Sequence, residues 1–364
     1  MSTPLEEAYR YFLFHPELKG RLLCKQHWLL VRADSLDLLT DLVPNFSGQT
    51  TSLCVGRASY SEQMDATFFS NLPVFPNVTE LEIHISWDSS RPLDLQKLQR
   101  LFPKLKRLNI ADPGGYLGSL TSLVGLEEFT LDEWYTCELG IIPSDSAPTL
   151  TRLNLIDCFE GEIEEDDEEE QPEKGWRIRE LHKFPHLRHL QIDPVHVGVE
   201  TLFDTATFSL QTLQVTILLR NSNFDQIFVP RPSLRNLRSL EIMVFRWYGV
   251  EGCSQTASIL EGIVLQVTQL STLEDLLLQM PFHRSWVPHF KSLEKLKVLE
   301  WRVGYFWFDE PLQPNQGVKA FDKIRSAGID MFHRAFEKVD FKVKPKIIIK
   351  AEEYYNWEGY RVYK

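Results

Sequence analysis

The sequence predicts an α/β solenoid, in which short strands alternate with helices and successive units stack along one axis. A hexad of the form apolar-x-x-Leu-x-apolar recurs along most of the chain, its copies are spaced at a nearly regular interval, and similar turn residues precede several of them. Internal repetition of this kind is the sequence signature of a solenoid, because stacked units bury an apolar side that one unit alone leaves exposed.

The hexads predict the strands. Nine copies occur, at Val78-Leu81-Ile83, Leu105-Leu108-Ile110, Leu126-Phe129-Leu131, Leu150-Leu153-Leu155, Leu187-Leu190-Ile192, Leu210-Leu213-Val215, Leu237-Leu240-Ile242, Leu273-Leu276-Leu278 and Leu296-Leu299-Trp301. A weaker copy with Leu53 and Val55 precedes them. Their starts are 27, 21, 24, 37, 23, 27, 36 and 23 residues apart, and most of these intervals fall in the range of about 20–29 residues that is typical of leucine-rich repeats. We therefore expect an irregular leucine-rich-repeat solenoid of about ten strand–helix units.

The segments between the hexads predict turns and helices. Near copies of a Phe-Pro-x-apolar turn lead directly into three hexads, at residues 75–78, 102–105 and 184–187. Proline ends a preceding helix and favours an extended strand after it. Amphipathic periodicity predicts helices at residues 93–101, 254–267 and 320–336, and one or two strands within residues 338–350. A generic α/β protein built from βαβ units is the alternative.

Two intervals are longer than the rest and predict insertions. The 37-residue interval contains residues 160–170, which we call the acidic run, and the 36-residue interval contains residues 248–268. The acidic run holds nine acidic side chains, so the formal net charge of −12 would be −3 without it. Because like charges repel one another, we expect a solvated, disordered loop at about residues 160–175. A contact with a basic peptide or a cation is the alternative.

Composition and charge limit which compartment and which kinds of partner are expected. The five cysteines form no C-x-x-C pair, which argues against a disulfide framework or a zinc knuckle. The first twenty residues lack the continuous apolar stretch of a signal peptide, and no run of about 18 apolar residues predicts a membrane span. We therefore expect a cytoplasmic or nuclear protein without membrane contact. Charge is nearly balanced outside the acidic run, so nucleic acid is not an expected partner.

The Phe-Pro-x-Leu-x-x-Leu-x-Ile pattern across residues 46–302 resembles that of F-box/leucine-rich-repeat proteins, especially the irregular forms of fungi. Residues 15–30, HPELKGRLLCKQHWLL, look like the second half of an F-box, although no Leu-Pro-x-Glu precedes them. The chain departs from the plainer repeat consensus, because only Cys158 occupies the Asn/Cys position. The resemblance implies a helical N-terminal cap or degenerate F-box at 1–45, a solenoid at 46–312 and a helix–strand C-terminal cap at 313–364.

The resemblance also implies a function without catalysis, that of a substrate-recognition subunit of a cullin–RING ubiquitin ligase. A Skp-family adaptor would then contact the N-terminal part of the chain through Leu18, Leu22, Leu23 and Trp28. Any solenoid needs terminal caps. A plain cap at residues 4–43, in a stand-alone scaffold protein with no ubiquitin role, is therefore the alternative.

The strand face turned away from the core is the expected binding surface. Side chains alternate along a strand, so the residue between the last two core positions of each hexad points to this face. In a leucine-rich-repeat solenoid it is the concave face, which recognises proteins, whereas a plain solvated face is the alternative. The candidates for contact with a protein substrate are Glu82, Asn109, Thr130, Asn154, Gln191, Gln214, Glu241 and Glu300, with the apolar Leu277 in the same column.

Catalysis and metal binding find no support in the motifs. The chain contains no G-x-S-x-G, P-loop or G-x-G-x-x-G, so no catalytic residue, cofactor or metal is predicted, and an enzyme is the least favoured class. His182, His186, His189 and His196 lie close in sequence, but Pro185 prevents one continuous helical face from presenting them. The aromatic residues 301–308 are expected to pack under the helix at 320–336, with a binding hot spot as the alternative.

Overall fold

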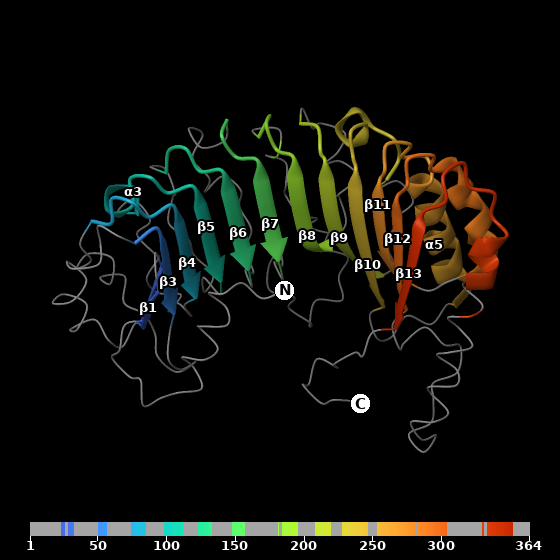
Figure 1. The fold of residues 1–364 in the computed structure, drawn as a ribbon, viewed down its shortest axis with the longest axis horizontal. Coiled ribbons are helices and arrows are strands. Elements are labelled where there is room, and N and C mark those ends of the chain that lie inside the picture. Colours follow the sequence, from blue (N-terminus) through green and yellow to red (C-terminus); the bar gives the residue numbers. More distant parts are fainter. Residues whose placement is uncertain are drawn as a thin grey trace, which may run out of the picture. The chain divides into compact units, whose positions relative to one another are not determined.

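The structure is a computed structural model of the chain. It describes residues 23–25, 28–32, 50–56, 74–84, 98–111, 123–132, 148–156, 181, 184–195, 208–219, 228–246, 253–280, 283–303, 330 and 333–351. The contacts between residues divide the chain into unit 1, Met1–Asp193, and unit 2, Pro194–Lys364. Each unit is an α/β arrangement whose strands are almost all parallel (Figure 1).

The described residues of unit 1 form eight strands that follow one another in chain order. They are β1 (Leu23–Lys25), β2 (Trp28–Arg32), β3 (Ser52–Gly56), β4 (Glu80–His84), β5 (Arg107–Ala111), β6 (Glu128–Asp132), β7 (Arg152–Ile156) and β8 (His189–Val195), the last of which runs just past the unit boundary. The first pair, β1 and β2, is antiparallel. Every later pair is parallel. A short helix, α3 (Leu98–Leu101), leads into the turn before β5.

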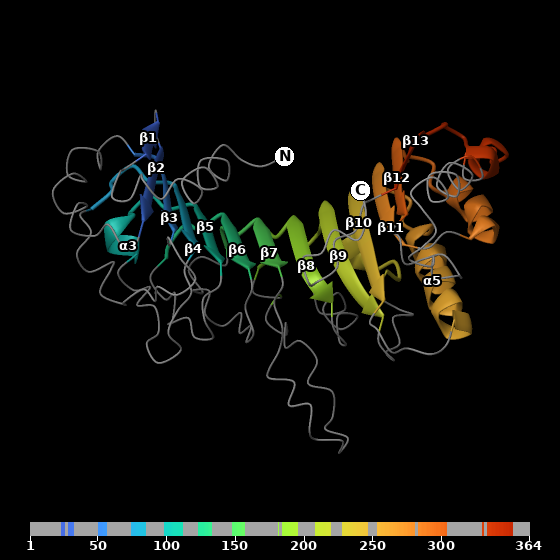
Figure 2. The ribbon, with the colours of Figure 1, turned by 90° about the horizontal axis from the view of Figure 1, so that it is seen from below.

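In unit 2, the part of the chain that the structure describes forms five strands, all parallel. They are β9 (Thr212–Leu219), β10 (Ser239–Arg246), β11 (Asp275–Gln279), β12 (Val298–Val303) and β13 (Lys346–Ala351). The helix α5 (Cys253–Val267) lies on one side of these strands (Figure 2). Two 3-10 segments, η8 (Pro232–Leu234) and η9 (Arg284–Ser292), precede β10 and β12.

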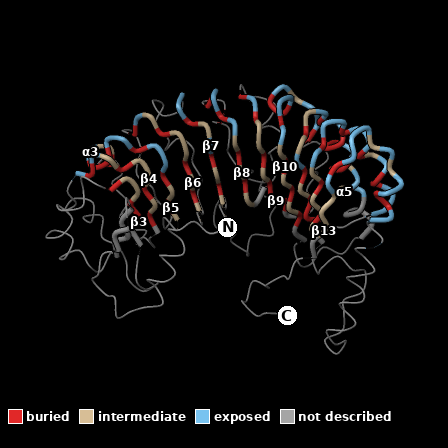
Figure 3. The backbone as a smooth tube through the Cα atoms, viewed as in Figure 1, coloured by how far each residue is buried: buried red, intermediate tan, exposed pale blue. Residues whose placement is uncertain are grey.

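The repeats of β4, β5, β6, β8, β10, β11 and β12 each bury four apolar positions, at i, i+3, i+6 and i+8 from the start of the turn. In the repeat of β4 these are Phe75, Val78, Leu81 and Ile83, all essentially inaccessible to solvent. The first two close the turn, because the N–H of Val78 donates to the carbonyl of Phe75 at 3.4 Å. The same turn bond recurs before β5, β8, β10, β11 and β12. Figure 3 shows the result as bands of buried residues that cross the strands of each unit.

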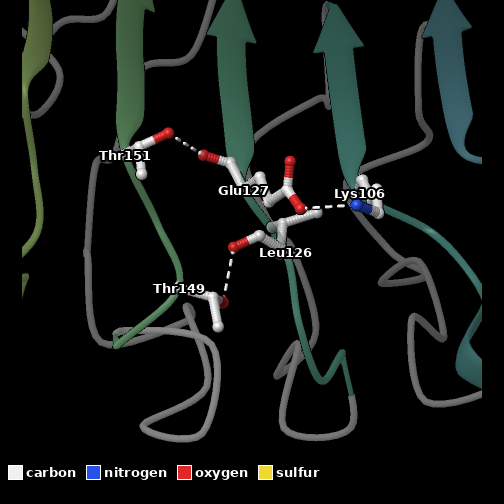
Figure 4. A network of polar contacts seen from close by, with 5 residues as sticks. All are labelled: Lys106, Leu126, Glu127, Thr149 and Thr151. Atoms are coloured by element: carbon white, nitrogen blue, oxygen red, sulfur yellow. Dashed lines mark hydrogen bonds and ion pairs between the residues drawn. The ribbon is translucent and has the colours of Figure 1, made fainter.

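Neighbouring repeats are joined by a repeated backbone contact at the entry to strands β4 to β8 and β10 to β12. The N–H groups of Glu127 and Glu128 both donate to the carbonyl of Lys106, at 2.7 and 3.0 Å. Side chains reinforce this edge (Figure 4): Thr149 Oγ1 donates to the carbonyl of Leu126 at 2.8 Å, and Thr151 Oγ1 donates to that of Glu127 at 3.2 Å. These bonds satisfy backbone carbonyls that the loop would otherwise leave to water.

Each hexad forms a strand, as predicted, and the strands are parallel and in register. The sheet also extends past the boundaries expected for the solenoid at 46–312. β2 pairs with β3 so that Leu29 and Val31 align with Leu53 and Val55. β13 pairs with β12 in the same way. Both added strands carry consecutive apolar residues, at 28–31 and 347–349, and aromatic and β-branched residues among them favour a strand.

The N-terminal segment departs from expectation. Residues 1–45 were expected to be helical, but Leu23–Lys25 and Trp28–Arg32 are strands. The Trp-Leu-Leu-Val sequence of β2 explains the difference, because aromatic and β-branched residues favour a strand and β3 offers it a hydrogen-bonding edge. The rest of residues 1–45 and the acidic run lie outside the described residues.

The helix and aromatic predictions are confirmed where the structure describes them. The helix expected at 254–267 is α5, and the described end of the helix expected at 93–101 is α3. Trp301 is fully buried and packs against Phe290 and Phe336, with ring centroids 5.9 and 6.4 Å away. Phe336, from the segment predicted as a helix at 320–336, therefore covers Trp301 as expected. Residues 304–308 lie outside the described residues.

Candidate functional site

The predicted binding residues of unit 1 form one column across the strands. The register pairs Glu82 with Asn109, Asn109 with Thr130, Thr130 with Asn154, and Asn154 with Gln191. All five side chains are partly exposed. We call them the unit 1 column. Because neighbouring strands lie about 4.8 Å apart, the column presents a polar group at each such step.

The predicted residues of unit 2 form a second column. Gln214 pairs with Glu241, Glu241 with Leu277, and Leu277 with Glu300. All four are partly exposed. Ile348 of β13 extends the column by one apolar residue that the hexad pattern does not reveal.

Hydrogen bonds link the unit 1 column along its length. Asn154 Nδ2 donates to Thr130 Oγ1 at 2.9 Å, and Asn109 Nδ2 donates to Glu82 Oε1 at 3.4 Å. The amide oxygen of Asn109, Oδ1, is buried and accepts no hydrogen bond from the described residues. An unpaired buried acceptor is unfavourable, so a donor that reached it would gain a hydrogen bond.

An ion-pair cluster occupies the unit 2 column. Arg302 Nε lies 2.7 Å from Glu300 Oε1, and Arg302 Nη1 lies 4.0 Å from Glu241 Oε1. The guanidinium thus reaches across β11 to join carboxylates of β12 and β10. The side chains of Arg302, Glu241 and Glu300 are only 25%, 28% and 14% exposed, so the cluster is better shielded from water than an ordinary surface pair. The carboxylates of the unit 2 column, Glu241 and Glu300, are therefore held in ion pairs within the chain.

A ladder of alternating charge flanks the unit 1 column. Glu80, Arg107, Glu128, Arg152 and His189 follow one another in register on β4 to β8. Arg107 pairs with Glu80, and Arg152 Nε lies 3.8 Å from Glu128 Oε1. Glu80 and Glu128 are not among the residues predicted from the sequence. The available signal was their place directly before the core leucine or phenylalanine of each hexad.

His189 ends this charge ladder. Burial and the nearby positive charge of Arg152 lower the pKa of its imidazole from its usual value, with a smaller contribution from Arg188, while Glu128 opposes them. The neutral ring is therefore favoured, and it can both donate and accept a hydrogen bond. This is useful for polar recognition and does not by itself indicate catalysis.

Cys54 continues the unit 1 column toward the N-terminus and was also not singled out. It pairs with Glu82 and is completely buried. Burial raises the pKa of the Cys54 thiol, and the negative charge of Glu82 raises it further. A thiol that stays protonated is a poor nucleophile and a poor metal ligand, so Cys54 is a packing residue of this surface.

The remaining predicted residues are not gathered into a site. Leu23 and Trp28 lie on the antiparallel strands β1 and β2, where Leu23 pairs with Leu30 and Trp28 with Lys25. An F-box would require both residues to be helical, but both lie on strands. Leu18 and Leu22 lie outside the described residues.

The histidines do not form a metal centre within the described residues. His186 is exposed on a turn and His189 lies on β8, while His182 and His196 fall outside the described ranges. Among the side chains that the structure places, no group of three potential ligands could hold a metal ion.

Comparisons with protein-family models and with curated proteins assign no family to this chain. No protein-family model matches the sequence, and no curated protein is significantly similar to it. No helix in the described part of the chain is both long enough and apolar enough to cross a membrane. The role of the chain must therefore be inferred from the chemistry of its surface.

Proposed function

We propose that the chain is a non-catalytic leucine-rich-repeat protein that binds another protein through the unit 1 column. One observation carries the proposal: five partly exposed polar side chains lie in register on consecutive parallel strands. A sheet holds such groups on a rigid backbone, so little conformational entropy is lost when a partner binds. Solenoids use extended strand faces of this kind for recognition.

The chemistry of the surface defines the partner. The unit 1 column offers amide donors and acceptors, one hydroxyl and one carboxylate, and the ladder beside it alternates in charge. Such a surface suits a partner with a mixed, polar face, because each charge then meets its opposite. A purely apolar ligand would leave these groups without hydrogen bonds, which is costly.

Alanine substitution of the column tests the proposal. We expect the triple variant Glu82→Ala, Asn154→Ala, Gln191→Ala to fold normally and to lose at least about tenfold in recovery of its partner, since each central polar contact contributes about 1 kcal/mol or more. The measurement is quantitative mass spectrometry after affinity capture, with proteins scored only when they respond to the variant. The control is Arg100→Ala, Arg188→Ala, which changes two exposed residues of the same unit outside the column. Equal recovery with wild type and the column variant would show that this face is not the binding surface.

The ligase role is the more specific form of the same proposal. The chain would serve as the substrate-recognition subunit of a cullin–RING ubiquitin ligase, with Leu18, Leu22, Leu23 and Trp28 at the contact with a Skp-family adaptor. Its support is the F-box-like sequence of residues 15–30, while the strands at Leu23–Lys25 and Trp28–Arg32 favour a stand-alone scaffold.

Direct binding to the adaptor separates these two roles. If the ligase role holds, the purified full-length chain binds a Skp-family adaptor in a pull-down, and Leu18→Asp with Leu22→Asp abolishes the binding. The control pair Arg100→Ala, Arg188→Ala retains it. A wild-type chain that fails to bind the adaptor removes the ligase role and leaves the scaffold, whatever the outcome for the unit 1 column.

A further inference from the structure

The edge of unit 2 at which the chain enters strands β10 to β13 carries an excess of basic side chains. Residues 235–238, 272–275, 294–297 and 342–346 contain seven basic side chains and three acidic ones. All seven basic residues are exposed. We call them the basic edge: Arg235, Arg238, Lys295, Lys297, Lys342, Lys344 and Lys346.

Backbone hydrogen bonds show that this edge is continuous. The N–H of Glu274 donates to the carbonyl of Arg238 at 2.8 Å, and that of Lys297 donates to the carbonyl of Glu274 at 2.6 Å. The N–H of Lys346 donates in turn to the carbonyl of Lys297 at 2.7 Å. The residues therefore follow one another across four adjacent strands, a width of roughly 14 Å at the usual strand spacing.

The positive charge of this edge is only partly neutralised. Lys297 pairs with Glu274, and Lys342 Nζ lies 2.8 Å from Glu294 Oε2. Within the described residues, no ion pair joins Arg235, Lys295, Lys344 or Lys346. The pKa of the Glu274 carboxyl is lowered, chiefly by its hydrogen bond from Lys297 and further by the charges of Arg238 and Lys295. A carboxylate placed here is thus stabilised as an anion.

The same chain carries a segment of opposite charge. The acidic run supplies nine carboxylates within residues 160–170, and the formal net charge of the rest of the chain is only −3. An extended segment of this length spans roughly 36 Å, at about 3.3 Å per residue. It is therefore long enough to follow the whole basic edge and to place several carboxylates beside unpaired basic groups.

We propose that the basic edge of one molecule binds the acidic run of a second copy of this chain. Every molecule carries both complementary parts, so the association needs no other protein. The attraction acts between exposed charges, and salt screens it: the Debye length falls from about 10 Å at 0.1 M ionic strength to about 3 Å at 1 M. The basic edge is separate from the unit 1 column, so this inference does not depend on the proposed recognition by the strand face.

Sedimentation velocity of the full-length chain tests the proposal. We expect association at 0.1 M salt and about 50 µM protein, and monomers at 1 M salt. The variant Arg235→Glu, Lys295→Glu, Lys344→Glu removes three exposed charges that form no ion pair among the described residues, and it is expected to be monomeric at both salt concentrations. The control Arg100→Glu, Lys104→Glu, Arg188→Glu has the same net charge, reverses exposed residues of unit 1, and continues to associate.

A labelled peptide of residues 158–172 identifies the occupant. It is expected to bind a full-length chain in which the acidic run has been changed to Asn and Gln, with an affinity at least about tenfold lower at 1 M salt. It should not bind when Arg235→Glu, Lys295→Glu and Lys344→Glu are added. Wild-type chains that remain monomeric at 0.1 M salt overturn the proposal. If wild type is monomeric but the peptide binds the chain with the Asn/Gln run, the acidic run occupies the basic edge of its own molecule.

Discussion

Neighbouring residues of a single strand have different roles in this molecule. Leu153 is fully buried, whereas the next residue, Asn154, is partly exposed and donates to Thr130. The alternation of a strand separates them, because successive side chains point to opposite faces. Individual positions can therefore be assigned to stability or to recognition, and substitutions at the two kinds of position should have different effects.

His189 makes stability depend on pH. Its folded-state pKa is lowered by burial and by Arg152, against the opposing effect of Glu128. As the pH falls below the usual histidine value of about 6.5, the unfolded chain binds more protons than the folded chain does. The contribution of His189 to the free energy of unfolding is therefore complete above that pH and is lost as the pH falls toward its folded-state pKa. We expect His189→Gln to lose less stability than wild type between pH 7.5 and 5.5 in urea unfolding.

His186→Gln is the matched control for this measurement. His186 lies in the turn before the same strand and is exposed. Its substitution is expected to leave the difference in the free energy of unfolding between pH 7.5 and pH 5.5 the same as in wild type. If His189→Gln and His186→Gln behave alike, the pH dependence arises elsewhere in the chain.

At the level of the structural element, the repeated unit is a turn followed by a strand. Phe102 and Leu105 close a turn, and Leu108 and Ile110 then point into the core from β5. All four are buried together, so the turn and the strand stabilise each other. This arrangement explains why the Phe-Pro-x-Leu context and the hexad recur as one pattern in the sequence.

Strand alternation predicts the effect of paired substitutions in β7. Leu153→Ala removes a fully buried side chain and is expected to lower the free energy of unfolding by about 2–5 kcal/mol. Asn154→Ala removes one hydrogen bond, to Thr130 Oγ1, and is expected to cost no more than about 1.5 kcal/mol. Chemical denaturation measures both. Equal losses would contradict the register in which Leu153 faces the core.

At the level of the whole molecule, charge is distributed unevenly along the chain. The acidic run accounts for most of the net charge of −12, while the exposed edge of unit 2 is basic. Composition reports only the sum of these charges. Their separation into an acidic segment and a basic edge is what makes contact between copies of the chain electrostatically favourable.

Replacing the acidic run tests its place in the molecule. A Gly/Ser segment of equal length changes the net charge from −12 to −3 and keeps the length of the connection between β7 and β8. If the run is solvated, as its charge predicts, the free energy of unfolding at 1 M salt should change by less than about 0.5 kcal/mol. A circular-dichroism titration with urea measures it. A larger loss would show that the acidic run contributes to the fold.

The sequence by itself determined which residues enter the core and which line the opposite strand face. Hexads such as Leu150-Leu153-Leu155 carry this information locally, because burial follows the two-residue period of a strand. The periodicity therefore sufficed to predict the strands β4 to β12 and the two columns. It missed β2, whose place in the sheet depends on the edge that β3 provides, whereas the strand expected within residues 338–350 is β13.

Only the tertiary structure decided which polar groups meet. Arg302 joins Glu300 on its own strand to Glu241 two strands away, and Lys297 follows Glu274 and Arg238 along one edge. These partners lie on different repeats, and the register of parallel strands, rather than their distance along the chain, brings them together. The physical reason is that burial repeats along a single strand, whereas an ion pair requires two charges to meet in space.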